Sequence, residues 1–383
     1  MTSPHIAFNG WFWDQPNTGS GQYVRRLLAN LRRVSPDLQM TLILPPHITA
    51  PDELPQDVSL VVTEAAKLRG NLGKVWFEQS TFPQMVKRVS ADIAHVPYWG
   101  PPLSSPARLV VSILDVIPLV IPEYSRGMMG RLYTSLVSAA SRGAAHVITL
   151  SHAAAIDIHE HLGLPESMIT PTYLAADERF HPRLGKERDE AVRAKYNLPD
   201  RFILSLSGYD LRKQINQLLL AYTYVVQAEG DEVTLVMGGK EPEWGTPIFP
   251  DMRKYAAELG IADRLQWIGH VDEDDKPSLY RLADVFAFPS RYEGFGLPVI
   301  EAMASGTPVV ANEIAVLAEI AADGAFLVEP GSARAMAGAL IALLEQPPLR
   351  ETMVNAGLGV ATHYSWRKTA KETLAVYEAV MRL

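Results

Sequence analysis

Two glutamates at an eight-residue spacing, Glu293 and Glu301, have the clearest capacity for chemistry in this chain. Between them, Gly294 and Gly296 would let a ligand approach backbone N–H groups at the start of a helix, which is a natural phosphate site. Glu293 lies in the predicted loop and Glu301 in the expected first helical turn, so both can face one crevice. A carboxylate in that turn can instead serve only as a partner of the helix dipole.

A second pattern precedes the first one. Gly208 ends an apolar run, and the adjacent cations Arg212 and Lys213 follow it in a short loop before a helical pattern. Two cations at the carboxyl end of a strand are suited to binding two phosphates. The alternative is a solvated turn without a ligand.

The acidic residues at 272–275 invite comparison with a metal site. They stand before a helical pattern at 276–283, where Asp and Glu commonly cap the helix and complement its dipole. The ten histidines show no ligand spacing, and cysteine is absent. We therefore predict no metal site, and no cofactor besides a substrate that itself carries phosphate.

These loops must be positioned by strands, and short apolar runs recur along the whole chain. Strand patterns occur at 5–10, 40–45, 58–63, 93–97, 109–114, 146–150, 202–207, 233–237, 265–268, 285–289, 308–311 and 325–328. Amphipathic helical patterns separate many of them, which is typical of parallel sheets. The fold class is therefore α/β, with two doubly wound, Rossmann-like domains that would enclose a cleft between their strand ends.

The predicted domains are 1–180 and 181–363, followed by a helix at 364–383 that packs back toward the first domain. The boundary is expected within residues 177–200, a charged stretch without apolar periodicity.

Composition narrows the function classes. Of 383 residues, 48% are hydrophobic and 20% charged, which is typical of a globular protein. The net charge of −8 argues against a general nucleic-acid binder. Neither a signal peptide nor an apolar run of about 20 residues is visible, so we expect a cytoplasmic protein.

The Glu293 segment resembles the signature of retaining glycosyltransferases of the GT-B fold, glycosyltransferase family 4. The resemblance implies that Glu293 contacts the transferred sugar and Glu301 the ribose of the donor. The segment from Gly208 to Lys213 resembles the basic stretch that binds the donor pyrophosphate, with Gln214 where the family usually has Asn. In the second half of the chain, the resemblance implies these donor-binding residues: Gly208, Arg212, Lys213, Val271, Glu293, Gly294, Phe295, Gly296, Leu297 and Glu301.

The first half of the chain contains two shorter matches. Gly19 and Gly21 resemble the family's glycine-rich loop beside the pyrophosphate and the acceptor. Asp115 resembles part of the family's His-Asp-x-x-Pro element, although Leu114 replaces the histidine that lies near the donor sugar. We predict Asp115 as a catalytic-site residue together with Glu293, Arg212 and Lys213.

The resemblance predicts a retaining transferase that moves a hexose from a nucleotide-sugar, GDP-mannose or a UDP-sugar, to a hydroxyl of a glycan, glycolipid or polysaccharide precursor. Glu273 and Lys276 could bind a guanine edge, which favours GDP-mannose. Two alternatives stay open at this point. One is a nucleotide-sugar epimerase of the GT-B type, and the other is a non-catalytic subunit that binds a nucleotide-sugar.

Basic and aromatic residues mix in two stretches of the first domain. One contains Arg25, Arg26, Arg32 and Arg33, and the other contains Lys67, Arg69, Lys74, Trp76, Phe77, Phe82, Met85, Lys87 and Arg88. They indicate either a solvated face over core aromatics or a patch that docks on the inner face of an anionic membrane and reaches a lipid-linked acceptor.

Overall fold

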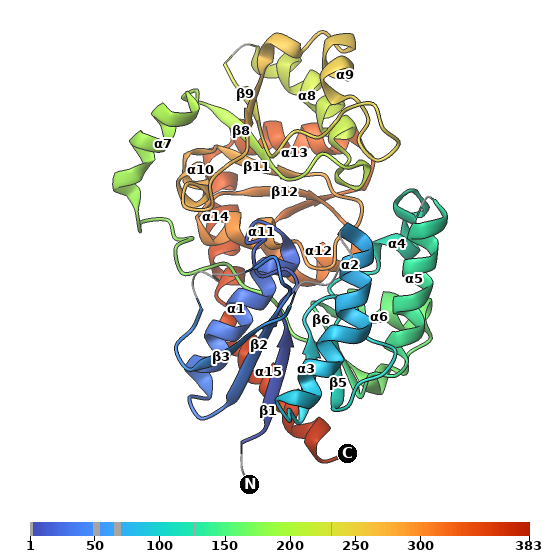
Figure 1. Ribbon diagram of the computed structural model, residues 1–383. Coiled ribbons are helices and arrows are strands. Elements are labelled where there is room, and N and C mark those ends of the chain that lie inside the picture. Colours follow the sequence, from blue (N-terminus) through green and yellow to red (C-terminus); the bar gives the residue numbers. More distant parts are fainter. Residues whose placement is uncertain (1–2, 49–53, 65–69, 126, 231) are drawn as a thin grey trace. The chain divides into compact units, whose positions relative to one another are not determined.

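The computed structural model describes residues 3–48, 54–64, 70–125, 127–230 and 232–383 (Figure 1). The chain forms two compact units. Unit 1 comprises Met1–Leu174 with Trp366–Leu383, and unit 2 comprises Ala175–Ser365. The predicted divisions after residues 180 and 363 differ from these by a few positions.

Unit 1 is built on a parallel sheet of seven strands in the order β3-β2-β1-β4-β5-β6-β7. The strands are β1 (His5–Asn9), β2 (Gln39–Leu44), β3 (Val58–Val62), β4 (Ile93–Val96), β5 (Arg108–Ser112), β6 (His146–Thr149) and β7 (Ile169–Pro171). The first six confirm predicted strands. The sequence patterns missed β7 because it has three residues and ends in a proline at the sheet edge.

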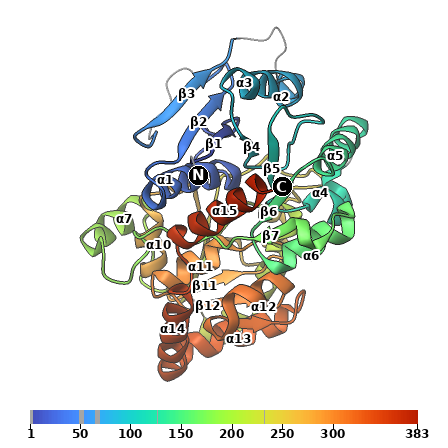
Figure 2. The ribbon, with the colours of Figure 1, turned by 90° about the horizontal axis from the view of Figure 1, so that it is seen from below.

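Helices cover both faces of this sheet. They are α1 (Gly19–Val34), α2 (Gly70–Trp76), α3 (Phe82–Arg88), α4 (Ile117–Val120), α5 (Met128–Ser141), α6 (His152–Leu162) and α15 (Trp366–Met381). A π-helical turn, Phe77–Thr81, joins α2 to α3. Figure 2 shows α1 and α15 together on one face, with α2 and α3 on the opposite face.

A buried hydrogen-bond chain holds α15 on unit 1. Tyr377 lies 2.5 Å from Nδ1 of His95, and Nε2 of His95 lies 2.7 Å from the Ser112 hydroxyl. The Tyr23 hydroxyl of α1 lies 2.9 Å from that of Ser112. Burial lowers the pKa of His95 to about 3, so its ring is neutral and belongs to the core.

Unit 2 has a parallel sheet of six strands in the order β10-β9-β8-β11-β12-β13. They are β8 (Phe202–Leu206), β9 (Thr234–Gly238), β10 (Leu265–Gly269), β11 (Val285–Phe288), β12 (Val309–Asn312) and β13 (Phe326–Val328), and each confirms a predicted strand. The helices are α7 (Asp189–Tyr196), α8 (Ile215–Glu229), α9 (Met252–Glu258), α10 (Lys276–Leu282), α11 (Leu297–Ala304), α12 (Ala315–Ala321), α13 (Ala333–Glu345) and α14 (Pro347–Ala361).

Both sheets are doubly wound, which confirms the predicted fold class of two Rossmann-like α/β domains. In each sheet the strand order reverses at one place, between β1 and β4 in unit 1 and between β8 and β11 in unit 2. Ligands of such sheets bind beyond the carboxyl ends of the strands at this reversal. Among the described residues, no helix combines the length and apolar character needed to cross a membrane.

Candidate functional site

The reversal point of unit 2 brings together three of the predicted site residues. Arg212 and Lys213 follow β8 in a 3₁₀ turn, Leu211–Lys213, and Glu293 follows β11. The two loops are tied by a hydrogen bond from the Arg291 N–H to the Arg212 carbonyl, at 2.9 Å. The fold therefore places both cations and the carboxylate where a doubly wound sheet binds its ligand.

Glu293 pairs with both cations. Its Oε2 lies 2.6 Å from Nη1 of Arg212, and its Oε1 lies 2.6 Å from Nζ of Lys213. The exposed fractions of these side chains are only 10–13%. The ammonium of Lys213 also lies 4.9 Å from the ring centre of Phe288 at the end of β11. We call Arg212, Lys213 and Glu293 the switch-point triad.

The charges in this triad govern its titration. Burial alone would raise the pKa of the Glu293 carboxyl, but Lys213 and Arg212 bring it below its usual range. Glu293 is therefore ionised at neutral pH. Burial lowers the pKa of Lys213, Glu293 offsets part of this effect, and Arg212 adds to it.

Gln214, at the position where glycosyltransferase family 4 usually has Asn, follows the two cations of the triad and contacts Asn312. Its backbone is left-handed, with φ of 47°. Its side-chain Oε1 accepts a hydrogen bond at 3.0 Å from Asn312, which also donates to the Pro289 carbonyl at 2.5 Å. The amide of Asn312 thus connects the two loops that carry the triad.

The glycine-bearing loop leads into α11 as the sequence predicts, with Leu297 as the first helical residue and Pro298 in the first turn. Gly296 has φ of 101°, and a Cβ there would lie 2.6 Å from a methyl carbon of Leu317. Phe295 is buried with its ring edge toward Tyr364. The positive φ and this close contact together explain glycine at 296.

Glu301 differs from the expectation in one respect. It is the fifth residue of α11 and lies beyond the first helical turn. Its carboxylate accepts a hydrogen bond at 3.1 Å from the hydroxyl of Tyr280, and it is 6% exposed. Burial raises the pKa of Glu301 to about 7, while the nearby Lys276 lowers it in part. A role as a dipole partner at the helix start does not explain such a position.

The expectation that the acidic residues at 272–275 cap α10 is wrong for Asp275. This residue precedes the helix, but its carboxylate makes no capping hydrogen bond. It accepts instead from Lys195 at 2.6 Å, Arg188 at 3.0 Å and the Tyr196 hydroxyl at 3.0 Å. Lys195 also pairs with Asp272, and Arg179 with Asp274. These ion pairs attach α7 and the segment before it to the loop between β10 and α10.

The remaining predicted residues fall in separate places. Gly208 lies two residues after the end of β8, and Val271 is buried just beyond β10. In unit 1, Gly21 is required by close packing, because a Cβ would lie 2.0 Å from the Gln15 carbonyl oxygen, whereas a Cβ at Gly19 would touch no atom within 4 Å. Asp115 accepts a hydrogen bond from the Ile117 N–H at 3.1 Å, at the start of α4.

Sequence reasoning missed a buried ion pair near the reversal point of unit 1. Lys74 of α2 lies 3.6 Å from Glu78 in the π-helical turn, and Tyr133 of α5 donates to both Glu78 oxygens at 3.1 and 3.2 Å. The rings of Phe12, Tyr98 and Tyr133 surround the Lys74 ammonium at 4.9–5.2 Å. Burial raises the pKa of Glu78 to about 7 despite Lys74. The i,i+4 spacing of Lys74 and Glu78 was the one available signal.

In the first basic stretch, which lies on α1, Arg25 makes local contacts. Arg25 donates to the Trp13 carbonyl at 2.8 Å and lies over the Trp13 ring. In the second stretch, Phe77 and Phe82 are core residues, and Lys67 and Arg69 lie outside the described residues.

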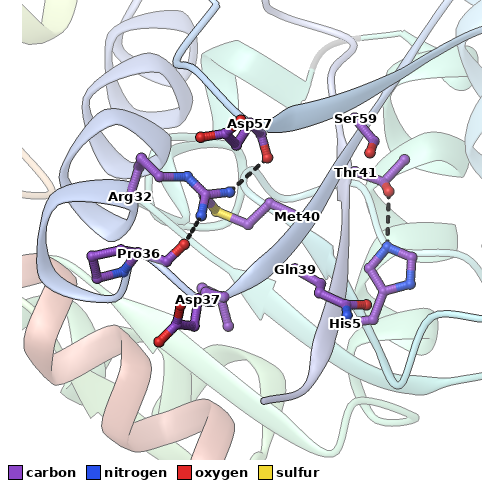
Figure 3. A pocket seen from close by; sticks show the side chains of 10 residues that line it. His5, Arg32, Pro36, Asp37, Gln39, Met40, Thr41, Asp57 and Ser59 are labelled. Atoms are coloured by element: carbon purple, nitrogen blue, oxygen red, sulfur yellow. Dashed lines mark hydrogen bonds between the residues drawn. The ribbon is translucent and has the colours of Figure 1, made fainter. Parts of the chain in front are cut away.

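A pocket of about 320 Å³ lies at the amino ends of β1, β2 and β3 (Figure 3). Hydrogen bonds, including one from Arg32 to the Pro36 carbonyl, occupy much of its polar lining. Arg32 donates to the Asp57 carbonyl at 2.7 Å, and the His5 ring lies 2.8 Å from the Thr41 hydroxyl. Because doubly wound sheets bind ligands at the opposite ends of their strands, we do not assign this pocket to the site.

Comparison with known proteins identifies the family of this chain. Residues 17–178 match the model of "Glycosyltransferase Family 4", and residues 188–359 match that of "Glycosyl transferases group 1". Together the two matches span most of both units.

Two curated relatives illustrate the likeness. The O-antigen chain mannosyltransferase B of Escherichia coli is 29% identical over 73% of this chain and 74% of the relative. The phosphatidyl-myo-inositol mannosyltransferase of Mycobacterium leprae is 34% identical over 52% of this chain, and the match spans about half of that relative (48%).

Among solved structures, the sucrose-phosphate synthase of Thermosynechococcus elongatus superimposes with a TM-score of 0.76 at 20% identity, covering 99% of both chains. At this level of identity the likeness establishes the fold.

Proposed function

This chain belongs to the glycosyltransferases of family 4 and group 1, and on that premise we propose that it is a retaining hexosyltransferase using a nucleotide-sugar donor. The donor is GDP-mannose in our proposal, with a UDP-sugar as the other choice. The acceptor is a hydroxyl of a glycan, glycolipid or polysaccharide precursor. The names of the two curated relatives support mannose as the transferred sugar.

The switch-point triad is the observation that carries this proposal. A nucleotide-sugar is bound through its diphosphate, and two buried cations beyond the carboxyl ends of β8 and β11 are suited to two phosphates. Arg212 offers a planar fork and Lys213 a compact charge. These cations do the electrostatic work on the leaving group, so we propose that no metal ion is required.

Glu293 supports a retaining reaction in which the enzyme supplies no nucleophile. Its two oxygens are bonded to Arg212 and Lys213, and its lowered pKa makes it a weak base. In the proposed step the bond from C1 to the diphosphate oxygen breaks and the acceptor oxygen bonds to C1 on the same face. The acceptor proton goes to the leaving phosphate, and Glu293 orients the sugar hydroxyls.

Glu301 and its neighbours support binding of the nucleoside. A buried carboxylate held by the Tyr280 hydroxyl can accept hydrogen bonds from the two ribose hydroxyls. Glu273 and Lys276 are paired with each other nearby. Guanine presents two neighbouring N–H donors to a carboxylate such as Glu273, which is the basis for placing GDP ahead of UDP.

For unit 1 we propose the acceptor side of the reaction. Gly19 at the start of α1 supports this. Among the described residues, no atom would lie within 4 Å of a Cβ at Gly19, so packing does not explain the glycine. One curated relative is named for a phosphatidyl-inositol acceptor. We therefore propose a lipid-linked acceptor and a contact of unit 1 with an anionic membrane at its cytoplasmic face.

Thermal unfolding in the presence of GDP-, UDP-, dTDP- and ADP-sugars tests the donor. A ligand at 100 times its dissociation constant stabilises a protein by about 2.7 kcal/mol, so the preferred donor gives a clear shift. No shift with any nucleotide-sugar would refute the proposed function. Incubation of the preferred donor without acceptor then distinguishes the alternatives. Slow release of the unchanged hexose indicates a transferase, a new free sugar indicates an epimerase, and no turnover indicates a binding subunit.

A further inference from the structure

Five of the ten exposed large apolar side chains in the described residues of unit 1 lie on two of its helices. On α2 these are Leu72 and Trp76, one helical turn apart. On α5 they are Met128, Met129 and Leu132, which share one side of the helix. Their exposed fractions lie between 49% and 68%. Single exposed apolar residues are ordinary, but five on two helices call for a partner.

The two helices are neighbours, as both ribbon views show (Figures 1 and 2). Lys74 of α2 donates to the hydroxyl of Tyr133 of α5 at 3.0 Å, and that hydroxyl bonds the buried Glu78. Lys74 lies two residues from both Leu72 and Trp76, so it projects from the other side of α2. The ion pair therefore joins the two helices through the side of α2 that lies opposite Leu72 and Trp76.

The charged residues of these helices indicate which kind of partner the surface fits. The sequences of α2 and α5 contain Lys74 and the exposed Arg131 but no aspartate or glutamate, although the whole chain has a net charge of −8. An acid-free apolar surface with a neighbouring arginine suits a bilayer with anionic headgroups. A second copy of the chain would bring two Arg131 side chains toward each other.

We propose that the exposed residues of α2 and α5, namely Leu72, Trp76, Met128, Met129 and Leu132, insert into the headgroup region of an anionic membrane. Trp76 is suited to the boundary between headgroups and acyl chains, and Arg131 to a lipid phosphate. This inference rests on the proposed lipid-linked acceptor, for which it names the docking surface. It also locates membrane contact on helices different from the arginine-rich α1.

Sedimentation with lipid vesicles tests the proposal. Vesicles contain phosphatidylcholine with about one-third phosphatidylglycerol, or phosphatidylcholine alone. We expect the wild-type protein to bind the anionic vesicles, and the triple variant Trp76→Ser, Met129→Ser, Leu132→Ser to bind them at least about tenfold more weakly. Arg131→Glu should weaken binding to anionic vesicles selectively.

The variant Ile156→Ser is a matched control, because Ile156 of α6 is equally exposed in the same unit, at 57%. It should bind vesicles like wild type. Equal vesicle binding by the triple and control variants would overturn the proposal, as would absence of binding by the wild type. A wild-type dimer in light scattering that the triple variant converts to a monomer, without vesicle binding, would assign the surface to a second copy instead.

The change in melting temperature caused by a nucleotide-sugar separates this proposal from the proposed function. All vesicle variants should keep the wild-type melting temperature and the wild-type shift with nucleotide, because the substituted side chains are exposed in unit 1. A protein that binds anionic vesicles but no nucleotide-sugar would retain the docking surface and refute the transferase function. Normal nucleotide binding without vesicle binding would refute the docking surface and leave the transferase function standing.

Discussion

Substitution of Glu293 by glutamine tests the switch-point triad most directly. The change keeps the shape of the side chain but removes the one charge that pairs with both Arg212 and Lys213. If Glu293 only touched the sugar, free nucleoside diphosphate would bind the variant as it binds the wild type. Because Glu293 occupies both cations, we expect a different result: a less stable protein that binds the free diphosphate more tightly.

The magnitude follows from the burial of the triad. Removing one partner of a buried ion pair costs about 3–5 kcal/mol, because the other charge is left unpaired. We expect about 3 kcal/mol, since the side chains keep 10–13% exposure and Asp210 lies 3.3 Å from Arg212. For a domain of the size of unit 2, this lowers the melting temperature by about 6–12 °C.

A diphosphate would restore charge pairing in the variant, whereas in the wild-type protein it must displace Glu293. Recovery of about half the penalty tightens binding about tenfold, since 1.4 kcal/mol corresponds to a factor of ten. Turnover should fall, because the sugar loses the carboxylate that orients it. Calorimetric titration with GDP and with inorganic pyrophosphate measures the affinity, and thermal unfolding measures the stability.

Glu241→Gln provides the matched control. Glu241 pairs with Arg253 in the same unit at 2.6 Å, and its side chain is 31% exposed. Its loss should leave diphosphate affinity unchanged. If Glu293→Gln binds GDP and pyrophosphate no better than the wild type while its melting temperature is unaltered, the triad is not a displaceable counter-ion for the donor.

Three further outcomes are expected. Lys213→Ala should weaken binding of the nucleoside diphosphate by about 1.5–3 kcal/mol, as for a charge-assisted hydrogen bond, and unchanged calorimetric affinity would remove Lys213 from the site. Activity should survive excess EDTA, and loss of turnover that manganese or magnesium restores would show that a metal takes part. Because the pKa of Glu301 is raised from 4.5 to about 7, the folded protein binds an extra proton between these pH values, so its stability falls as the pH rises through that interval. Glu301→Gln should remove this part of the pH dependence of the melting temperature and weaken both donor and free nucleotide, and an unchanged profile with normal affinity would contradict the ribose assignment.

The amino-acid sequence determined the architecture to a large extent. Buried parallel strands need apolar residues on both faces, and such runs predicted twelve of the thirteen strands in the described residues. The loops that carry Arg212, Lys213 and Glu293 could be predicted because glycines and charged residues interrupt this pattern at the strand ends. Only β7 was missed, because it combines a length of three residues with a terminal proline, which is atypical of a buried strand.

The tertiary structure decided which charges meet. Glu293 lies 80 positions from Lys213, and Asp275 lies 80 positions from Lys195. The family resemblance implied only a sugar contact for Glu293, and local spacing predicted a helix cap for Asp275. Neither indicated the cations with which these carboxylates pair in the fold. The cage around Lys74 likewise takes Phe12, Tyr98 and Tyr133 from three separate segments. Periodicity reports whether a side chain faces the interior, whereas the energy of a buried charge depends on a partner that only the folded sheet brings within about 3 Å.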